Sequence, residues 1–417
     1  MVKLIQNMYF KKIKINDWQQ FQNIEIDFHE RLTILTGANA SGKTTILNLL
    51  ARHCGWDAKS LATPKKDLKT KIWTWLNGIT DFLTENEEEN TKGELHYNEG
   101  KSLLKVPKQQ NDAQYNIKIE GQQEVKCFFI PSHRSVFRYK KVTQIPTGST
   151  IDKKQAFNKV WDSNKNRYNN GSDTPSNFFI KEDLLCWNIF GQGNKDMDPN
   201  EKLLSYYDGF QDVLKKILPK TLGFEKISIQ NSEVVLICKS GNFIIDASSG
   251  GISALIDIAW QIYFYSTEDN PDFTVLIDEI ENHLHPTMQR QILPDLMAAF
   301  PKTRFIVSTH NPLIVGSVKD SNIYALRYNE ENKVISEKLD FVNEAKTASE
   351  ILDEVLGVSF TMPIWVEEKL NQIIAEYLGN TITEEKFFQL REKLKEAGLE
   401  KIMPEAVYNL IKNDKNK

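Results

Sequence analysis

Residues 32–50 of this 417-residue chain read LTILTGANASGKTTILNLL, and this stretch decides the fold. Apolar and β-branched residues typical of a buried strand lead into a loop of small residues, and an apolar pattern typical of a helix follows. The loop fits the pattern G-x-x-x-x-G-K-[ST] without a mismatch. Because strand, loop and helix stand in the order that this motif requires, the sequence predicts a phosphate-binding loop and a helix over 43–51.

Each residue type in the loop has a physical task. Gly37 and Gly42 allow backbone conformations in which successive N–H groups point at phosphate oxygens. Lys43 places a positive charge at the β- and γ-phosphates, and Thr44 offers a hydroxyl to Mg²⁺. The helix that follows directs its positive dipole end at the same oxygens. We therefore expect ATP and Mg²⁺ to bind here, and the expected cofactor contacts are Gly37, Asn39, Ala40, Ser41, Gly42, Lys43, Thr44 and Thr45.

Residues 273–286, FTVLIDEIENHLHP, supply acids for the same site. The apolar run predicts a buried parallel strand, and such strands present functional groups at their carboxyl ends. Asp278 is expected to hold Mg²⁺, and Glu279 is expected to orient the attacking water. The structural alternative is a strand that merely ends in two acids.

Residues 304–312, RFIVSTHNP, repeat the pattern of a short apolar strand that ends in polar residues. His310 would lie where a neighbouring strand could present it to a γ-phosphate. Taken alone, a histidine at a strand end is usually structural, and the catalytic interpretation depends on the two motifs above.

Residues 246–263, DASSGGISALIDIAWQIY, predict a helix that starts with Ser248, Ser249 and Gly250. Serines at a helix start are ordinary N-caps. A helix start with small residues is also an anion site. Because the first phosphate already has its own loop, this second site would serve the ATP of another protomer.

Composition sets limits on the function. Net charge is −4 with 26% charged residues, which does not indicate a nucleic-acid binder, although a local basic patch could still act alone. No apolar run is long enough for a membrane span, and the N-terminus resembles a strand rather than a signal peptide. The four cysteines lie far apart without C-x-x-C spacing, so we expect reduced thiols and a cytoplasmic protein.

The order of the patterns predicts an α/β nucleotide-binding domain that is built from both ends of the chain. Within it we expect a helix over 71–83, strands at GELHY and YNIKIE, and a small meander over 225–246. The expected parts are an ATPase lobe over 1–56, an insertion with a helix and short strands over 57–124, a core strand and linking segment over 125–148, a helical insertion over 149–224, the second part of the ATPase lobe over 225–340 and a helical tail over 341–417.

Together these motifs resemble those of ABC-type P-loop ATPases of the RecF/SMC-like class, whose heads have a mixed or parallel sheet. In that family two heads enclose two ATP molecules, and the signature serine of one head faces the phosphate loop of the other. The resemblance gives Ser248 and Gly250 the signature roles. The chain departs from the family pattern at Ala247 and Gly251, which puts the signature contact in doubt, and at Ala40, where a glycine is frequent.

The run DEIENHLHP resembles OLD-related ATPases of bacterial defence systems. In this branch His283 and His285 would belong to a loop at the dimer interface. The segment 128–148, FFIPSHRSVFRYKKVTQIPTG, also resembles this branch, in which it would link the nucleotide state to the inserted lobe. His133 and Arg134 could sense phosphate or a partner there, and the alternative is a basic surface turn.

The OLD nucleases carry a metal-dependent nuclease domain after the ATPase, but residues 320–417 show no Asp-x-Asp at a strand end, so we expect no nuclease site. Similar stand-alone ATPases of Septu- and PARIS-type antiphage systems act with a separately encoded effector. The resemblance therefore implies a Mg-dependent ATPase subunit that forms a homodimer or larger homo-oligomer and controls an effector nuclease. A phage component or nucleic acid stays open as a further partner, and no membrane is expected. The alternatives are a RecF-like DNA-repair clamp and an ATP-binding assembly module with little turnover.

Overall fold

A computed structural model describes most of the chain as two compact units, Met1–Ile351 and Leu352–Lys417. The described residues are 7–66, 73–76, 89–107, 109–110, 113–146, 152–170, 174–267, 271–339, 364–376 and 384–399.

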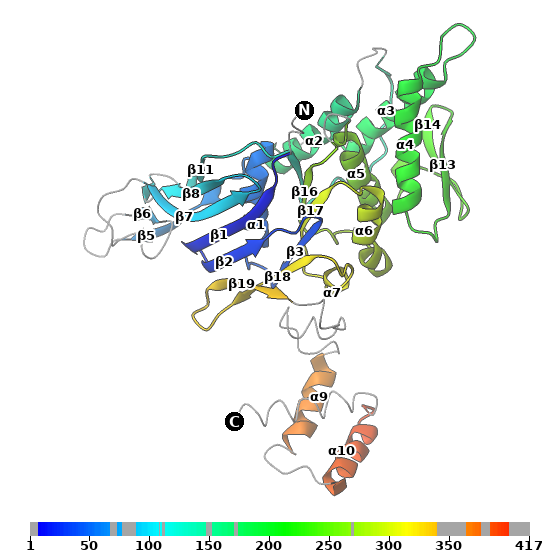
Figure 1. Cartoon of the computed structure of the whole chain (residues 1–417). Helices are drawn as coiled ribbons and strands as arrows, with labels where there is room; N and C mark the ends of the chain where they lie inside the picture. The colour runs from blue at the N-terminus through cyan, green and yellow to red at the C-terminus, as the bar shows by residue number, and fades with distance from the viewer. Residues whose placement is uncertain are drawn as a thin grey trace. The chain divides into compact units, whose positions relative to one another are not determined.

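An eleven-stranded sheet forms the centre of the first unit, and five of its strands carry the parallel part (Figure 1). β3 pairs in parallel with β17 on one side and with β18 on the other, and β17, β16 and β12 continue the parallel order. All positions of β3 and β16 are buried, as expected for strands covered on both faces. These strands are β3 (Leu32–Gly37), β12 (Cys127–Ile130), β16 (Thr274–Ile277), β17 (Arg304–Ser308) and β18 (Asn322–Tyr328).

The other part of the sheet is mainly antiparallel. β2, β1, β7, β8 and β11 follow one another as antiparallel neighbours, and β19 joins the two parts because it pairs with β18 and with β2. The strand predicted at GELHY is confirmed as part of β7. The strand predicted at YNIKIE is confirmed only for its last three residues, which form β11, whereas Tyr115 belongs to the separate strand β10 (Gln114–Tyr115). The bounds are β1 (Phe10–Trp18), β2 (Phe21–Asp27), β7 (Glu89–Tyr97), β8 (Lys101–Pro107), β11 (Lys118–Glu120) and β19 (Val334–Leu339).

Helix α1 (Lys43–Ala51) lies against the parallel strands and carries the phosphate-binding sequence at its start. Its apolar side chains are buried in a core that also contains residues of both parts of the sheet. The helix predicted over 43–51 is therefore confirmed. A short 3-10 helix, Arg52–Cys54, follows it directly.

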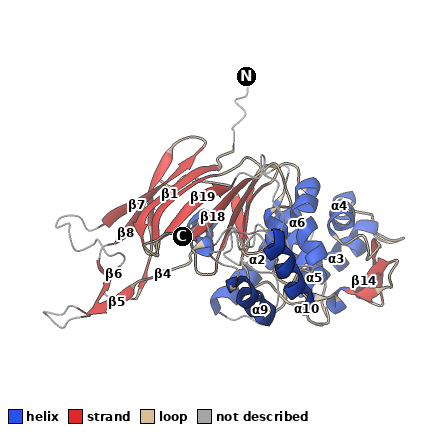
Figure 2. Ribbon diagram, turned by 90° about the horizontal axis from the view of Figure 1, so that it is seen from below, coloured by secondary structure: helices blue, strands red, loops and turns tan. Residues whose placement is uncertain are grey.

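A lobe of helices stands beside the parallel edge of the sheet (Figure 2). Trp187 of α3 stacks on Trp260 of α5 with 5.5 Å between ring centroids, and both rings are fully buried. A separate sheet of β13, β14 and β15 packs on α3 and α4. These elements are α2 (Lys153–Asn170), α3 (Ser176–Gln192), α4 (Glu201–Ile217), β13 (Phe224–Gln230), β14 (Glu233–Cys238), β15 (Phe243–Ile244), a 3-10 helix (Ile245–Ala247), α5 (Gly250–Tyr265), α6 (Pro286–Ala299) and α7 (Pro312–Val315).

The helices and the meander of this lobe confirm the predicted secondary structure of the described residues within 149–246, which are 152–170 and 174–246. The domain limits given above stay a prediction. The helix predicted over 71–83 is wrong where it can be compared, because Trp73–Leu76 form strand β6 between β5 (Thr63–Lys66) and β9 (Gln109–Gln110). Aromatic and β-branched residues favour a strand once neighbours are available for pairing. Residues 71–72 and 77–83 lie outside the described residues.

Two short strands, β4 (Ser60–Leu61) and β10 (Gln114–Tyr115), pair with each other after the 3-10 helix. The segment with β4 lies beside α1, and residues of both line a pocket.

The second unit contains α9 (Ile364–Ala375) and α10 (Glu384–Glu396). The two helices pack through an apolar cluster of their own, so the predicted helical patterns of the tail are confirmed there. Among the described residues of both units, no helix is long and apolar enough to cross a membrane. The cluster comprises Val366, Leu370, Ile374, Leu390, Leu394 and Leu399.

Candidate active site

The loop between β3 and α1 has a backbone that only small residues can adopt. Gly37 and Gly42 have φ angles of 137° and 92°. A Cβ atom at Gly37 would lie 2.4 Å from the carbonyl oxygen of Leu326, and one at Gly42 would lie 2.3 Å from the ring of Phe21. Both glycines are therefore needed for conformation and for space. Ala40 shares the left-handed conformation with φ 64°, although it carries a Cβ.

The side chain of Lys43 folds back over this loop. Its Nζ donates to the carbonyl oxygens of Gly37 and Ala38, each at 2.9 Å, and the residue is buried. Burial lowers the pKa of Lys43, whereas the charges of Asp278 and Glu279 raise it. A buried ammonium enclosed by small residues fits a polyphosphate, which would supply the missing negative charge.

Asp278 follows β16 directly and joins three segments that are far apart in sequence. The hydroxyl of Thr44 lies 3.1 Å from Oδ1 and 3.0 Å from Oδ2 of Asp278, and Ser308 donates to Oδ1 at 2.5 Å. Burial raises the pKa of this carboxyl, and the two hydroxyls counteract the rise. A hydroxyl beside a carboxylate is a donor set that fits Mg²⁺.

Glu279 stands in a left-handed backbone conformation, with φ 45°. Its N–H donates to Ser308 Oγ at 2.8 Å, and its carboxylate accepts from Nδ2 of Asn282 at 2.8 Å. The acid is half-buried, so it is both oriented by the protein and reachable from outside.

His310 follows β17 and is held by an acid that the sequence analysis did not assign a role. Glu281 is buried, and its Oε1 lies 2.7 Å from the backbone nitrogen and 3.0 Å from Nδ1 of His310. The imidazole remains 48% exposed. The signal for Glu281 was its place two residues after Glu279. Ser308 gave no signal of its own.

The segment after β12 differs from the alternative interpretation, a basic surface turn. Arg134 is buried, and its guanidinium contacts backbone carbonyls of the turn after β16. His133 is exposed, and its Nδ1 lies 3.1 Å from the hydroxyl of Ser132. The interpretation of Arg134 as a surface residue is therefore wrong, because its hydrogen-bonding partners lie in the interior.

The predicted signature residues lie at the start of α5. Ser249 is the N-cap residue and is exposed, but its side chain caps no backbone N–H. The Oγ atom of Ser248 is buried and has no hydrogen-bond partner in the described part of the chain. Gly250 faces the turn of His283, with 3.7 Å between a Cβ built on the glycine and the Cβ of His283. Within the described residues, no hydrogen bond joins these serines to Lys43, Thr44 or Asp278.

The structure thus joins three predicted residues in one hydrogen-bonded group: Thr44 contacts Asp278 directly, and Ser308 links Asp278 to Glu279. His310 is attached to the same turn through Glu281. The signature residues stand apart from this group.

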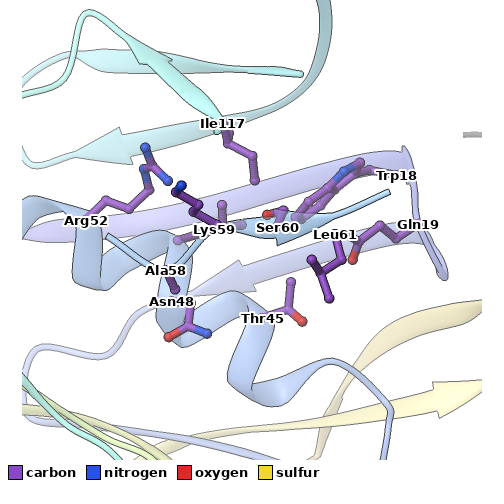
Figure 3. A pocket seen from close by; sticks show the side chains of 11 residues that line it. Trp18, Gln19, Thr45, Asn48, Arg52, Ala58, Lys59, Ser60, Leu61 and Ile117 are labelled. Atoms are coloured by element: carbon purple, nitrogen blue, oxygen red, sulfur yellow. The ribbon is translucent and has the colours of Figure 1, made fainter. Parts of the chain in front are cut away.

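A pocket of about 230 Å³ lies along α1, next to the phosphate-binding loop (Figure 3). Thr45, one of the predicted contacts, is part of its wall, and the segment with β4 forms the opposite wall. The lining mixes apolar side chains with amides and cations, which suits a flat polar ligand. The lining residues are Trp18, Gln19, Thr45, Asn48, Leu49, Arg52, Ala58, Lys59, Ser60, Leu61 and Ile117.

Comparisons with known proteins agree with this geometry. The family AAA_21, described as "AAA domain, putative AbiEii toxin, Type IV TA system", matches residues 32–316. The "Retron Ec83 probable ATPase" of Escherichia coli is 31% identical over 204 residues, which are 45% of this chain and 35% of that protein.

Two proteins named "Septu protein PtuA" are similar over most of this chain. The one from Bacillus mycoides is 22% identical over 88% of this chain and 47% of its own length. The one from Bacillus thuringiensis is 22% identical over 86% of this chain and 87% of its own length. This chain therefore spans less than half the length of the retron ATPase and of the first Septu protein. The predicted resemblance to ABC-type ATPases of defence systems is confirmed.

Proposed function

We propose a function for this chain from its membership in the AAA_21 family of AAA domains. In this proposal the chain binds and hydrolyses ATP and controls a separately encoded effector nuclease in antiphage defence. The observation that carries the ATPase part is the group formed by Thr44, Asp278 and Ser308. It brings a phosphate-binding loop and the end of a buried parallel strand together, with hydrogen bonds of 2.5–3.1 Å.

In this proposal the residues of one chain divide the work. Lys43 and the amides of the loop bind the phosphates, and Thr44 and Asp278 would hold Mg²⁺. The metal ion supplies charge neutralisation for phosphoryl transfer when it is bound. Glu279, fixed by Asn282, orients the attacking water.

His310 would meet the γ-phosphate. Its Nδ1 and backbone nitrogen share one oxygen of Glu281, so Nε2 is the ring nitrogen left to face a ligand. Its 48% exposed side chain is accessible for that contact.

The pocket beside α1 would hold the nucleoside part of ATP. Thr45 belongs both to the predicted loop contacts and to the pocket wall, so the phosphates and the base would occupy connected space. Trp18 and Leu61 offer apolar surface for a base, while Gln19 and Asn48 offer amides for its polar edge.

A second copy of the chain would complete the site. The start of α5 presents Ser249 and Gly250 at the surface, and Ser248 carries a buried hydroxyl without a partner among the described residues. A helix start with uncapped N–H groups attracts anions. We propose that these residues contact the ATP of a second chain in a homodimer or larger assembly.

The effector part of the proposal rests on the relatives, which carry retron and Septu names. It places this chain in the cytoplasm as the ATPase subunit of a defence complex. The alternative DNA clamp has less support from the surface. The lysines of β1 could contact DNA, but Lys12 pairs with Glu25 and Asp27, and Lys14 pairs with Glu25, so two of the three lysines in residues 10–15 are paired with acids.

The test is the native mass and composition of the complex purified from cells that carry the neighbouring genes. A stable assembly of several copies with a nuclease-like protein, disrupted when ATP is removed, is expected. A chain that forms a dimer with ATP and binds DNA, with strong dependence on salt, would replace this proposal by the DNA clamp.

A further inference from the structure

Arg134, in the segment after β12, holds the turn that carries the acids. Its Nη2 donates to the carbonyl oxygens of Asp278 at 3.2 Å and Glu279 at 2.9 Å. Its Nη1 donates to those of Ile280 at 3.3 Å and Asn282 at 3.1 Å. The residue is 6% exposed. One planar guanidinium therefore fixes four peptide groups of a single turn.

The turn needs such support because its backbone is strained. A residue other than glycine in the left-handed region costs about 1–2 kcal/mol, and Glu279 has φ 45°. Ser308 holds the other side of the turn. Its Oγ accepts a hydrogen bond from the N–H of Glu279 at 2.8 Å, and its carbonyl oxygen accepts one from the N–H of Ile280 at 3.2 Å. Arg134 on the carbonyl side and Ser308 on the amide side together determine where Glu279 points.

Arg134 also faces the helical lobe. Burial lowers its pKa to about 10, and the carboxylate of Asp257 in α5 opposes that shift more than any other charge, so the guanidinium stays charged at neutral pH. Asp257 is fully buried and accepts from Nε2 of Gln261 at 2.8 Å. The next residue, Ser135, accepts from the N–H of Ser176 at the start of α3. The segment thus connects the turn after β16, residues 278–282 (the acid turn), to two helices of the lobe.

We propose that Arg134 is a positioning residue for ATP hydrolysis, which acts through the backbone of Glu279 and not on the nucleotide itself. This inference rests on the proposed function, because it requires Glu279 to act on ATP. It predicts that the geometry of the guanidinium, and not only its charge, sets the rate of hydrolysis.

Arg134→Lys separates geometry from charge. A lysine keeps the positive charge opposite Asp257, but its three N–H groups sit on one atom and cannot span four carbonyls. We expect kcat to fall by about tenfold to a hundredfold, as a small displacement of a catalytic group does. The affinity for ATP should stay close to that of the wild type, whereas the urea midpoint should fall, because at least one buried carbonyl loses its donor. Arg138→Lys, an exposed change in the same segment, is the matched control.

A second variant guards against a folding defect. Arg134→Met combined with Asp257→Asn removes both buried charges, so neither is left unpaired. We expect the double variant to fold and bind ATP, with kcat still low. A double variant with wild-type kcat, or Arg134→Lys with unchanged kcat, would overturn the inference, since charge balance alone would then explain the arginine.

The same assays keep this inference separate from the proposed function. A wild-type chain that fails to bind ATP refutes the proposed function and the inference with it. A wild-type chain that binds ATP without any turnover over hours refutes the hydrolysis part of the proposed function and overturns the inference with it. A wild-type chain that hydrolyses ATP as fast as Arg134→Lys refutes the inference alone.

Discussion

The acid turn after β16 and the start of α5 differ in how their polar atoms are satisfied. In the acid turn, Asp278 and Glu279 have hydrogen-bond partners within the same chain, and Glu281 binds His310, which follows β17. At the start of α5, Ser249 is exposed without capping its helix, and the hydroxyl of Ser248 has no partner among the described residues. The first region is organised mainly within one chain, with Oε2 of Glu281 as a buried oxygen that lacks a partner among the described residues. The second region presents both a buried hydroxyl and an exposed helix start that a ligand could still satisfy.

The base of the second region is nevertheless rigid. Asp246, two residues before Ser248, accepts from Nδ2 of Asn177 at 2.5 Å and pairs with the buried Lys181 at 2.8 Å. The chain thus holds Asp246, before the loop, by internal contacts, and leaves the polar groups of Ser248 and Ser249, at the start of α5, without such contacts among the described residues. The start of α5 can therefore leave polar groups available for a ligand of a second chain although the residues just before it are held by hydrogen bonds and an ion pair.

Glu279→Gln should produce the largest effect. An amide cannot take the proton of an attacking water, so we expect hydrolysis to fall by about a hundredfold to ten-thousandfold while ATP stays bound. The trapped ATP should stabilise the dimer. Single-turnover hydrolysis and retention of labelled nucleotide measure the two effects, and Glu225→Gln, an exposed change on β13, is the control.

The counterpart on the binding side is Lys43→Ala. Because this change removes the buried cation of the loop, ATP binding should weaken by about tenfold to a hundredfold, the usual worth of a charged hydrogen bond. Equal retention of ATP in the two variants would contradict the division of roles between Lys43 and Glu279.

Ser249→Asp tests the open region next. Aspartate is as good an N-cap residue as serine, so the stability of α5 should not change. A carboxylate there would repel the phosphates of a second chain, and the ATP-dependent dimer should weaken by about tenfold or more. Sedimentation with ATP in the Glu279→Gln background measures the dimer.

Asn200→Asp places the same charge at the N-cap of α4 and is the matched control, since Asn200 already accepts from the N–H of Leu203. A Ser249→Asp variant that dimerises like the control would remove the start of α5 from the interface.

The sequence predicted the parts of the site that depend on local order. The helix at the loop depends mainly on neighbouring residues, so α1 starts and ends where the sequence predicted it, at Lys43 and Ala51. Arg134 could not be placed in the same way, because its partners lie 144 to 148 residues away and are backbone atoms. The strand at Trp73–Leu76 was missed for a related reason: its choice between helix and strand depends on pairing with distant residues.

The helical lobe should respond to pH through Asp183 of α3. Burial raises the pKa of Asp183 to about 6, and the ion pair with Lys159 at 2.7 Å opposes the rise. Because the folded chain holds this proton more tightly than the unfolded chain, the group stabilises the fold below about pH 4, and that contribution is lost as pH rises through about 6.

Asp183→Asn removes this titration and leaves Glu182 to pair with Lys159. The free energy of unfolding of the wild type, relative to the variant, should fall by about 2–3 kcal/mol between pH 4 and pH 7. Urea unfolding across this pH range provides the measurement. Parallel curves for the two proteins would mean that Asp183 titrates normally and that the lobe tolerates an ordinary buried ion pair.

The smallest effect is expected inside the phosphate loop, at Ala40. Its φ of 64° is costly for a residue with a Cβ, and the hydroxyl of Tyr328 fixes the loop by donating to its carbonyl at 3.0 Å. Ala40→Gly removes the strain but gives the unfolded chain more freedom, so the gain in stability should be at most about 1 kcal/mol. Ala298→Gly, on an exposed position of α6, should instead lose about 1 kcal/mol. If both changes lower the free energy of unfolding in urea by the same amount, the backbone of Ala40 is not strained, and the phosphate-binding loop costs no more conformational energy at this position than a helix does.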